Sequence, residues 1–164
     1  FGLALAAVIF ACAFQHYQTD EALTFLGSDA ATQIRVAERV ELYVLTSPED
    51  PQGEPWMKDG RLLFRSQGPR DISQAHGLIH ARQALLQDAS YRFDQSPTEC
   101  KGPFTHLLRF ASDHSTTLLF DLECRRMQIL ETGTEVRLGE HLAEGLKIFL
   151  AEQAKEKKAE NRRK

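Results

Sequence analysis

The sequence predicts an α+β fold in which an N-terminal transmembrane helix precedes one small domain with helices packed on an antiparallel sheet. Three patterns support this prediction: an uncharged apolar segment at residues 1–14, alternating hydrophobic residues typical of strands, and two stretches with helical hydrophobic spacing. The 164 residues leave about one ordinary domain after the apolar segment. We divide the chain into a transmembrane anchor at 1–17, a juxtamembrane connector at 18–33, an α+β domain at 34–152 and a basic, disordered tail at 153–164.

The apolar segment, FGLALAAVIFACAF, is out of place at the solvated end of a domain. It is slightly shorter than the roughly 20 apolar residues of a complete span, so we interpret it as the end of a transmembrane helix or signal sequence. The rings of His16 and Tyr17 suit the interface of a bilayer, and no Lys or Arg lies between Phe1 and Gln33. The positive-inside rule then places this flank on the non-cytoplasmic side of a membrane. We expect a bacterial inner-membrane protein with its domain on the periplasmic side.

Two other interpretations of this segment stay open. The residues Ile9-Phe10-Ala11-Cys12 are similar to a bacterial lipobox, which would make Cys12 a lipidation site, although Phe10 departs from the small residue usual before Ala. The segment could also form a buried core helix. The abrupt change to polar residues after Phe14 counts against that interpretation.

The first half of the domain shows one strand, a loop and one helix. Alternation over Val36–Leu45 predicts a half-buried strand. Prolines then predict a loop at 47–55, and a short strand at 61–65 precedes a Gly68-Pro69 turn. The clearest helix is predicted over 71–87, with Asp71 and Gln74 at the spacing of a capping box and a hydrophobic stripe that includes Ile72, Ala75, Ile79 and Leu86.

The second half predicts a β-hairpin, a third strand and a last helix. A loop at 112–116 would set Phe110 opposite Leu118 and Leu108 opposite Phe120, so that the inward face is continuous. A third strand follows at 127–130, before a turn at 132–134. The last helix is indicated by apolar residues at helical spacing, Leu138, Leu142, Leu146 and Phe149.

Cys100 and Cys124 are the candidate disulfide. In the predicted hairpin Cys124 lies across from Phe104, four residues after Cys100, and Gly102-Pro103 can bend the chain back. The two sulfurs then come within reach of a bond, which is expected in an oxidising compartment. Two buried thiols are the alternative. A metal site is less favoured, because neither Cys belongs to a C-x-x-C motif and no His lies beside either one at ligand spacing.

Other candidate residues give weaker signals. His76 and His80 have the i, i+4 spacing of a two-histidine metal face, but Gly77 stands where a zinc-protease motif needs Glu, so we interpret both as solvated. Trp56 is either a partner anchor or a cap on its own core. The sequence has no G-x-S-x-G elbow and no phosphate-binding glycine motif. We predict no catalytic residue, metal or cofactor; the partner-contact candidates are Trp56, Phe1, Phe10 and Phe14.

Residues 85–124 resemble uncharacterised small bacterial envelope proteins that are membrane-anchored or lipoprotein-like. The matching residues are Leu85-Leu86, Asp88, Ser90-Tyr91, Cys100, Pro103, Leu108-Arg109-Phe110 and the segment Thr117–Cys124. The resemblance implies no activity. It does imply that Cys100 and Cys124 belong to one structural feature.

We expect a non-catalytic accessory or scaffolding subunit of a larger membrane complex, which could be respiratory, photosynthetic or secretory. Its expected partners are other membrane protein subunits and the lipid bilayer. Nucleic acid is not expected, because the net charge of −3 lacks the surplus of Lys and Arg that phosphate contacts need. Two alternatives are a free-standing envelope lipoprotein that binds a ligand or the cell wall, and an anchored metal-dependent enzyme that uses His76, His80 or the cysteines.

Overall fold

The fold was determined as a computed structural model, which describes residues 19–47, 50, 53–58, 60–97, 100 and 102–160, without the side chains of Met57, Gln67 and residues 154–160. Along the chain, two helices precede three strands, a helix and a short 3-10 helix follow, and four more strands precede the last helix. They are α2 (Asp20–Leu26), α3 (Ser28–Val36), β1 (Arg39–Leu45), β2 (Glu54–Lys58), β3 (Arg61–Asp71), α4 (Leu78–Leu85), the short 3-10 helix η1 (Asp88–Ser90), β4 (His106–Ala111), β5 (Ser115–Asp121), β6 (Arg126–Ile129), β7 (Glu135–Arg137) and α5 (Glu140–Glu160).

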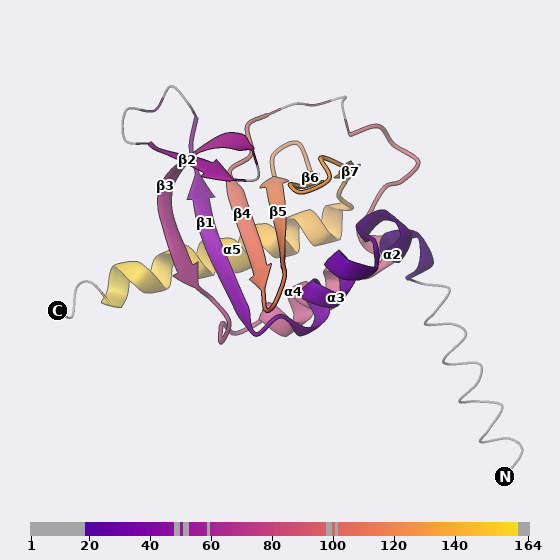
Figure 1. Ribbon diagram of the computed structural model, residues 1–164, viewed down its shortest axis with the longest axis horizontal. Helices are drawn as coiled ribbons and strands as arrows, with labels where there is room; N and C mark the ends of the chain where they lie inside the picture. Colours follow the sequence, from indigo (N-terminus) through magenta and orange to yellow (C-terminus); the bar gives the residue numbers. More distant parts are fainter. Residues whose placement is uncertain are drawn as a thin grey trace, which may run out of the picture.

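The strands form one antiparallel sheet in the order β2-β3-β1-β4-β5-β6-β7. Figure 1 shows α5 crossing behind the strands, while α2, α3 and α4 gather at one end of the sheet. This arrangement confirms the predicted small α+β domain with helices on an antiparallel sheet.

Alternating side chains divide the sheet into two faces. On the helix side Leu42, Phe110 and Phe120 are at most 3% exposed, in a core shared with α2, α3, α4 and α5. On the other face Tyr43, Leu107, Leu119 and several neighbours form a second, smaller cluster. Burial on both faces explains why consecutive residues are hydrophobic in the central strands, as at Leu107 and Leu108 on β4 and at Leu118 and Leu119 on β5.

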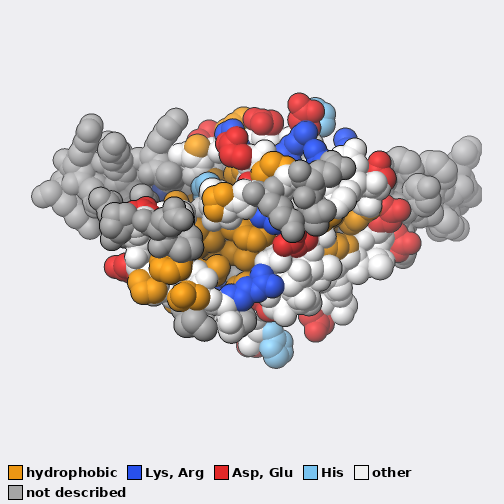
Figure 2. All heavy atoms as spheres, turned by 90° about the horizontal axis from the view of Figure 1, so that it is seen from above, with side chains coloured by type: hydrophobic (Ala, Val, Ile, Leu, Met, Phe, Trp, Pro, Cys, Tyr) orange, Lys and Arg blue, Asp and Glu red, His pale blue; other side chains and the backbone are white. Residues whose placement is uncertain are grey.

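The β2–β3 hairpin closes over this second cluster. Trp56 and Leu63 pack against it from the hairpin, and Arg61 at the start of β3 donates a hydrogen bond to Gln128 on β6. The β2–β3 hairpin therefore curls across the sheet toward β6. Figure 2 looks at this end from above and shows hydrophobic side chains gathered at the centre, with Lys and Arg side chains beside them.

The expected single-pass membrane architecture is corrected. No described helix combines the length and the apolar character that crossing a bilayer demands. The longest described helix, α5, has 21 residues, but Glu and Lys recur along it. The anchor predicted at 1–17 lies outside the described residues. The fold class that the described residues support is a small α+β domain with an antiparallel sheet.

The connector predicted at 18–33 is part of the domain instead. It forms α2 and most of α3, in which Ala22 and Ile34 are fully buried in the main core. The backbone N–H of Ala22 also donates to the Asp88 carboxylate at 2.7 Å. Because α3 continues to Val36, the first strand starts at Arg39 and not at Val36.

The helix predicted over 71–87 is much shorter, since α4 begins at Leu78. Asp71 ends β3, where it pairs with Glu41, and its carboxylate accepts hydrogen bonds from the backbone and hydroxyl of Ser73. These bonds lower the pKa of Asp71 below its ordinary value. The capping-box prediction is therefore wrong, because a local side-chain turn and the positive φ of Gly77 precede the helix.

Strand β3 runs through the predicted Gly68-Pro69 turn, with irregular register against β1 at that point. The hairpin of β4 and β5 exists with its register shifted by two residues, so Leu108 pairs with Leu118 and Phe110 with Thr116. A shift of two keeps the predicted face inward. Strand β6 closely matches the predicted third strand, β7 was not predicted, and α5 continues to Glu160, into the segment expected to be disordered.

Candidate functional site

A groove of about 460 Å³ lies between α4 and α5, on the helix side of the molecule. The two helices run in opposite directions: Gly77 before α4 lies against Phe149 near the middle of α5, and the backbone N–H of Gly139 before α5 donates to the Ser90 carbonyl after α4 at 2.7 Å. The α5 wall extends from His141 to Glu152. At 1.5 Å per residue this wall is about 17 Å long, or three helical turns.

The sequence opens this groove by placing small residues between two anchored helices. Leu85 of α4 and Leu146 of α5 are at most 1% exposed and fix both helices to the core. Between them the groove is lined by Ala81, Ala84 and Gly145. An added Cβ at Gly145 would meet no atom within 4 Å, so the space above it is open. The groove is therefore a consequence of missing side-chain volume and not of a gap in the core.

An exposed isoleucine adds to the apolar lining of the groove. Ile148 lines it and is 61% exposed, whereas Ile79, in the first turn of α4, is 63% exposed but does not line the groove. The sequence analysis placed Ile79 on the buried stripe of a longer helix, and that placement is wrong because the stripe was read from a helix start seven residues too early. Exposed aliphatic side chains beside an open apolar groove are typical of a binding surface.

Polar groups lie toward the ends of the groove. Gln87, Ser90 and His141 are near one end, and His76 and Glu152 are near the other. No set of three or more His, Cys, Asp or Glu side chains is arranged to hold a metal ion within the described part of the chain. His76 and His80 thus border an apolar groove in which His141 comes from the facing helix.

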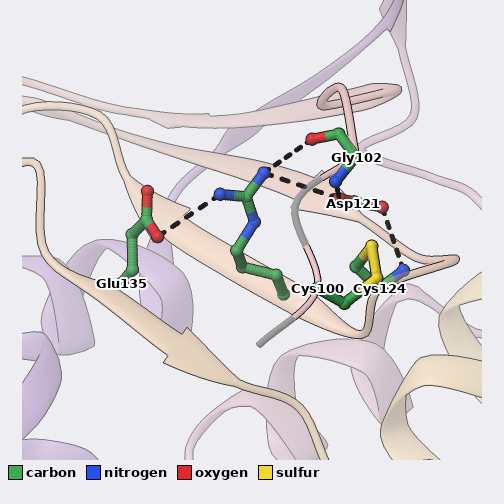
Figure 3. Close-up of a disulfide and its surroundings, with 6 residues drawn as sticks. Cys100, Gly102, Asp121, Cys124 and Glu135 are labelled. Carbon is green, nitrogen blue, oxygen red and sulfur yellow. Dashed lines mark hydrogen bonds and ion pairs between the residues drawn. A yellow bond between two sulfur atoms is a disulfide. The ribbon is translucent and has the colours of Figure 1, made fainter. Parts of the chain in front are cut away.

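A second cluster of polar groups surrounds the disulfide between Cys100 and Cys124, the pair that the sequence singles out, whose Cα atoms are 5.4 Å apart (Figure 3). The buried Asp121 carboxylate accepts the backbone N–H groups of Gly102 and Cys124 at 2.9 and 3.0 Å. Arg126 donates to the carbonyl of Gly102 at 2.7 Å. The two bonds to Gly102 hold its segment against the end of β5 and β6, and the bond to Cys124 closes the β5–β6 turn, so we interpret this cluster as structural.

A third candidate is the face that carries Glu41, Tyr43 and Arg109. Glu41 is 5% exposed, accepts a hydrogen bond from the Tyr43 hydroxyl at 3.1 Å and pairs with Arg109 at 3.2 Å. Burial, together with the adjacent Glu41 carboxylate, raises the pKa of Tyr43. A phenol with a raised pKa is a poor base and a poor nucleophile at neutral pH. The carboxylate is satisfied by its neighbours, which is typical of a structural ion pair.

The structure separates the remaining predicted site residues. Trp56 stacks on Tyr43 with ring centroids 4.7 Å apart, and Arg65 lies 5.8 Å from the Trp56 ring centroid, so the indole packs on its own domain. Phe1, Phe10, Phe14 and Cys12 lie outside the described residues. The groove itself was missed; its signal in the sequence is Gly145 and Ile148 on the α5 face that also carries His141 and Glu152.

Comparison with known proteins finds similar sequences but does not assign the chain to a family. The chain is similar to an uncharacterised protein of Mycobacterium bovis and to an uncharacterised protein of Mycobacterium tuberculosis, with 35% identity over 71 residues in each case. The aligned region is 43% of this chain and 48% of each relative, so the chain spans about half the length of the curated relatives it matches. No protein-family model matches the chain. No solved structure matches it either.

Proposed function

We propose that this chain is a non-catalytic protein-binding domain whose α4/α5 groove receives an amphipathic helix of a partner protein. One observation carries the proposal: the groove is open, mostly apolar and bordered by the exposed Ile148. A domain of this kind serves an accessory or scaffolding role by holding another protein.

The dimensions of the groove favour a helix as the bound element. Its α5 wall, from His141 to Glu152, matches about three turns of a helix laid along it. An amphipathic helix presents apolar anchors at i, i+3, i+4 and i+7, which span a similar length. Small side chains such as Gly145 allow the anchors of the incoming helix to sit deep between α4 and α5, as in the packing of a third helix against an existing pair.

The exposed Ile148 supplies part of the driving force for binding. Transfer of an exposed isoleucine side chain from water into an apolar contact contributes about 1.5–3 kcal/mol when burial is complete. Ile148 lines the groove and is more than half exposed, so a covering helix would remove its apolar area from water. The central residues of the groove would dominate the affinity, as anchors in well-packed pockets do.

The compartment follows from the disulfide as part of the same proposal. A bond between Cys100 and Cys124 supports a location in an oxidising compartment, such as a bacterial periplasm or the cell exterior. The resemblance of residues 85–124 to small bacterial envelope proteins would fit that location. The proposed partner is then another protein of the same compartment, and no membrane anchor is part of the proposal.

A defined peptide tests this function. The probe is a fluorescein-labelled amphipathic peptide of about 14 residues with Leu at i, i+3, i+4 and i+7, and its binding to the full chain is followed by fluorescence anisotropy. Ile148→Ser should weaken binding about tenfold or more through lost apolar contact. Val36→Ser is the matched control, because Val36 is a 58% exposed aliphatic residue on α3 that does not line the groove.

Saturable binding that Ile148→Ser weakens and Val36→Ser leaves unchanged supports the proposal. Equal weakening by both variants would assign the binding to general hydrophobic contact and would contradict a groove site. Absence of binding by peptides with this anchor pattern, at concentrations up to the millimolar range, would also contradict it.

A further inference from the structure

The charged lining of the groove is uneven. Among the described residues that line it, Glu152 carries the formal charge, and it lies at the end where α4 begins. His76 is at the same end, whereas Gln87, Ser90 and His141 are at the opposite end. A bound helix therefore meets a carboxylate at one end only.

Among the side chains that the structure describes, the two cations of α4 and α5 near the groove are paired away from Glu152. Lys147 pairs with Glu123 at 3.1 Å on the flank of α5 that faces the β5–β6 turn. Arg82 of α4 turns away and donates to the carbonyls at the C-terminal end of α3, including that of Ala37 at 2.6 Å. Both of these described cations are committed elsewhere, and Glu152 is an exposed residue that lines the groove, where an incoming partner would meet it.

Gly145 adds information about the apolar part of the partner. Glycine inside a helix costs about 1 kcal/mol relative to alanine. Neither a positive φ nor a close neighbour requires glycine at position 145, because an added Cβ there would meet nothing within 4 Å. The open space above Gly145 is about two turns of α5 from Glu152. It can admit one bulky side chain of a bound helix.

From these observations we infer that the partner helix carries a Lys or Arg about two turns from a bulky apolar anchor, with the cation at Glu152 and the anchor above Gly145. This inference rests on the proposed function and specifies its partner. Charge complementarity at an exposed site adds little affinity, but it fixes the direction in which the helix lies. The partner is thus a cationic amphipathic helix and not an acidic one.

Three peptides with the same leucine pattern test the inference. They differ at one position, about two turns from the central leucine, which holds Lys, Gln or Glu. The full chain should bind the Lys peptide about threefold more tightly than the Gln peptide, and the Glu peptide more weakly still. Glu152→Gln should remove this order, and Glu152→Lys should reverse it.

Matched variants separate this inference from the proposed function. Glu144→Gln removes an exposed α5 carboxylate that does not line the groove, so it should keep the Lys preference. Gly145→Leu should fill the space and weaken all three peptides while the chain stays folded. Binding that is indifferent to the peptide charge, with Gly145→Leu still weakening it, would overturn the charge assignment alone. Loss of binding of every peptide would overturn the proposed function, and the inference with it.

Discussion

Asp121 and Arg126 face one another as a register pair of β5 and β6, with Oδ2 of Asp121 3.5 Å from Nη2 of Arg126. Both side chains are at most 7% exposed. Both also bind the backbone of Gly102: the Asp121 carboxylate accepts the Gly102 N–H, and Arg126 donates to the Gly102 carbonyl. The ion pair therefore fixes a distant segment of chain to the end of the sheet. It also explains why position 102 is glycine, since an added Cβ would lie 2.8 Å from the Asp121 carboxylate.

Removal of one partner of this pair should be costly. Arg126→Met leaves the buried Asp121 without its cation, and we expect a loss of about 3–5 kcal/mol in the free energy of unfolding. The double variant Asp121→Asn with Arg126→Met should lose less than the sum of the single variants, because neither charge then stays buried alone. Urea unfolding of the four proteins measures this coupling. Additive losses would show that the two groups act independently.

The disulfide should stabilise the same region. Replacement of Cys100 and Cys124 by Ala should lower the free energy of unfolding by about 3 kcal/mol, because the bond closes a loop between residues 24 positions apart. The reduced wild-type protein serves as the control and should show a similar loss. Rapid reaction of both thiols with iodoacetamide in the unreduced native protein would contradict the bond.

His106 should make stability depend on pH. Burial lowers its pKa below the ordinary 6.5. The unfolded chain therefore binds the proton more readily than the folded one, so the free energy of unfolding falls as the pH drops below about 6.5 toward the lower folded pKa. His106→Gln should flatten this decline between about pH 6.5 and pH 5 in thermal unfolding. His114→Gln, at an exposed position in the β4–β5 turn, should leave the slope unchanged.

Two glycines should respond to alanine in opposite directions. Gly145→Ala should raise the free energy of unfolding by about 0.5–1 kcal/mol, because position 145 is helical and the added Cβ is free of contacts. Gly68→Ala should destabilise the fold, since φ is +122° there and the Cβ would lie 2.9 Å from the Tyr43 ring. Chemical denaturation of both variants checks the signs. A loss of stability in Gly145→Ala would mean that the groove has less room than described.

Most of the α+β domain could be predicted from local patterns. The alternation in β1, β4 and β5 indicated the strands, because their inward residues face a continuous helix-covered core. Strand β7 could not be predicted, since its three residues depend on pairing with β6. The predicted start of α4 was wrong because Asp71 pairs with Glu41 on β1 and its carboxylate accepts the backbone N–H of Ser73, so it does not begin a helix. Periodicity alone does not rank such alternatives.

The site was harder to predict than the fold. Trp56 and the His76–His80 pair attracted attention through residue type, yet Trp56 packs on Tyr43 and no described metal cluster includes the histidines. The groove depends on which helix faces meet, and this is a tertiary property. The sequence indicates the groove only through Gly145, a helical glycine that no close neighbour requires, and through the exposed Ile148.

The most direct test of the central claim is amide chemical-shift mapping of the full chain during titration with the Lys-containing leucine peptide. We predict perturbations that saturate and that are largest on α4, η1 and the α5 wall from His141 to Glu152. Signals on the β2–β3 hairpin around Trp56 should stay in place. Perturbations centred on that hairpin, or none at all at millimolar peptide, would contradict the claim that the α4/α5 groove binds a partner helix.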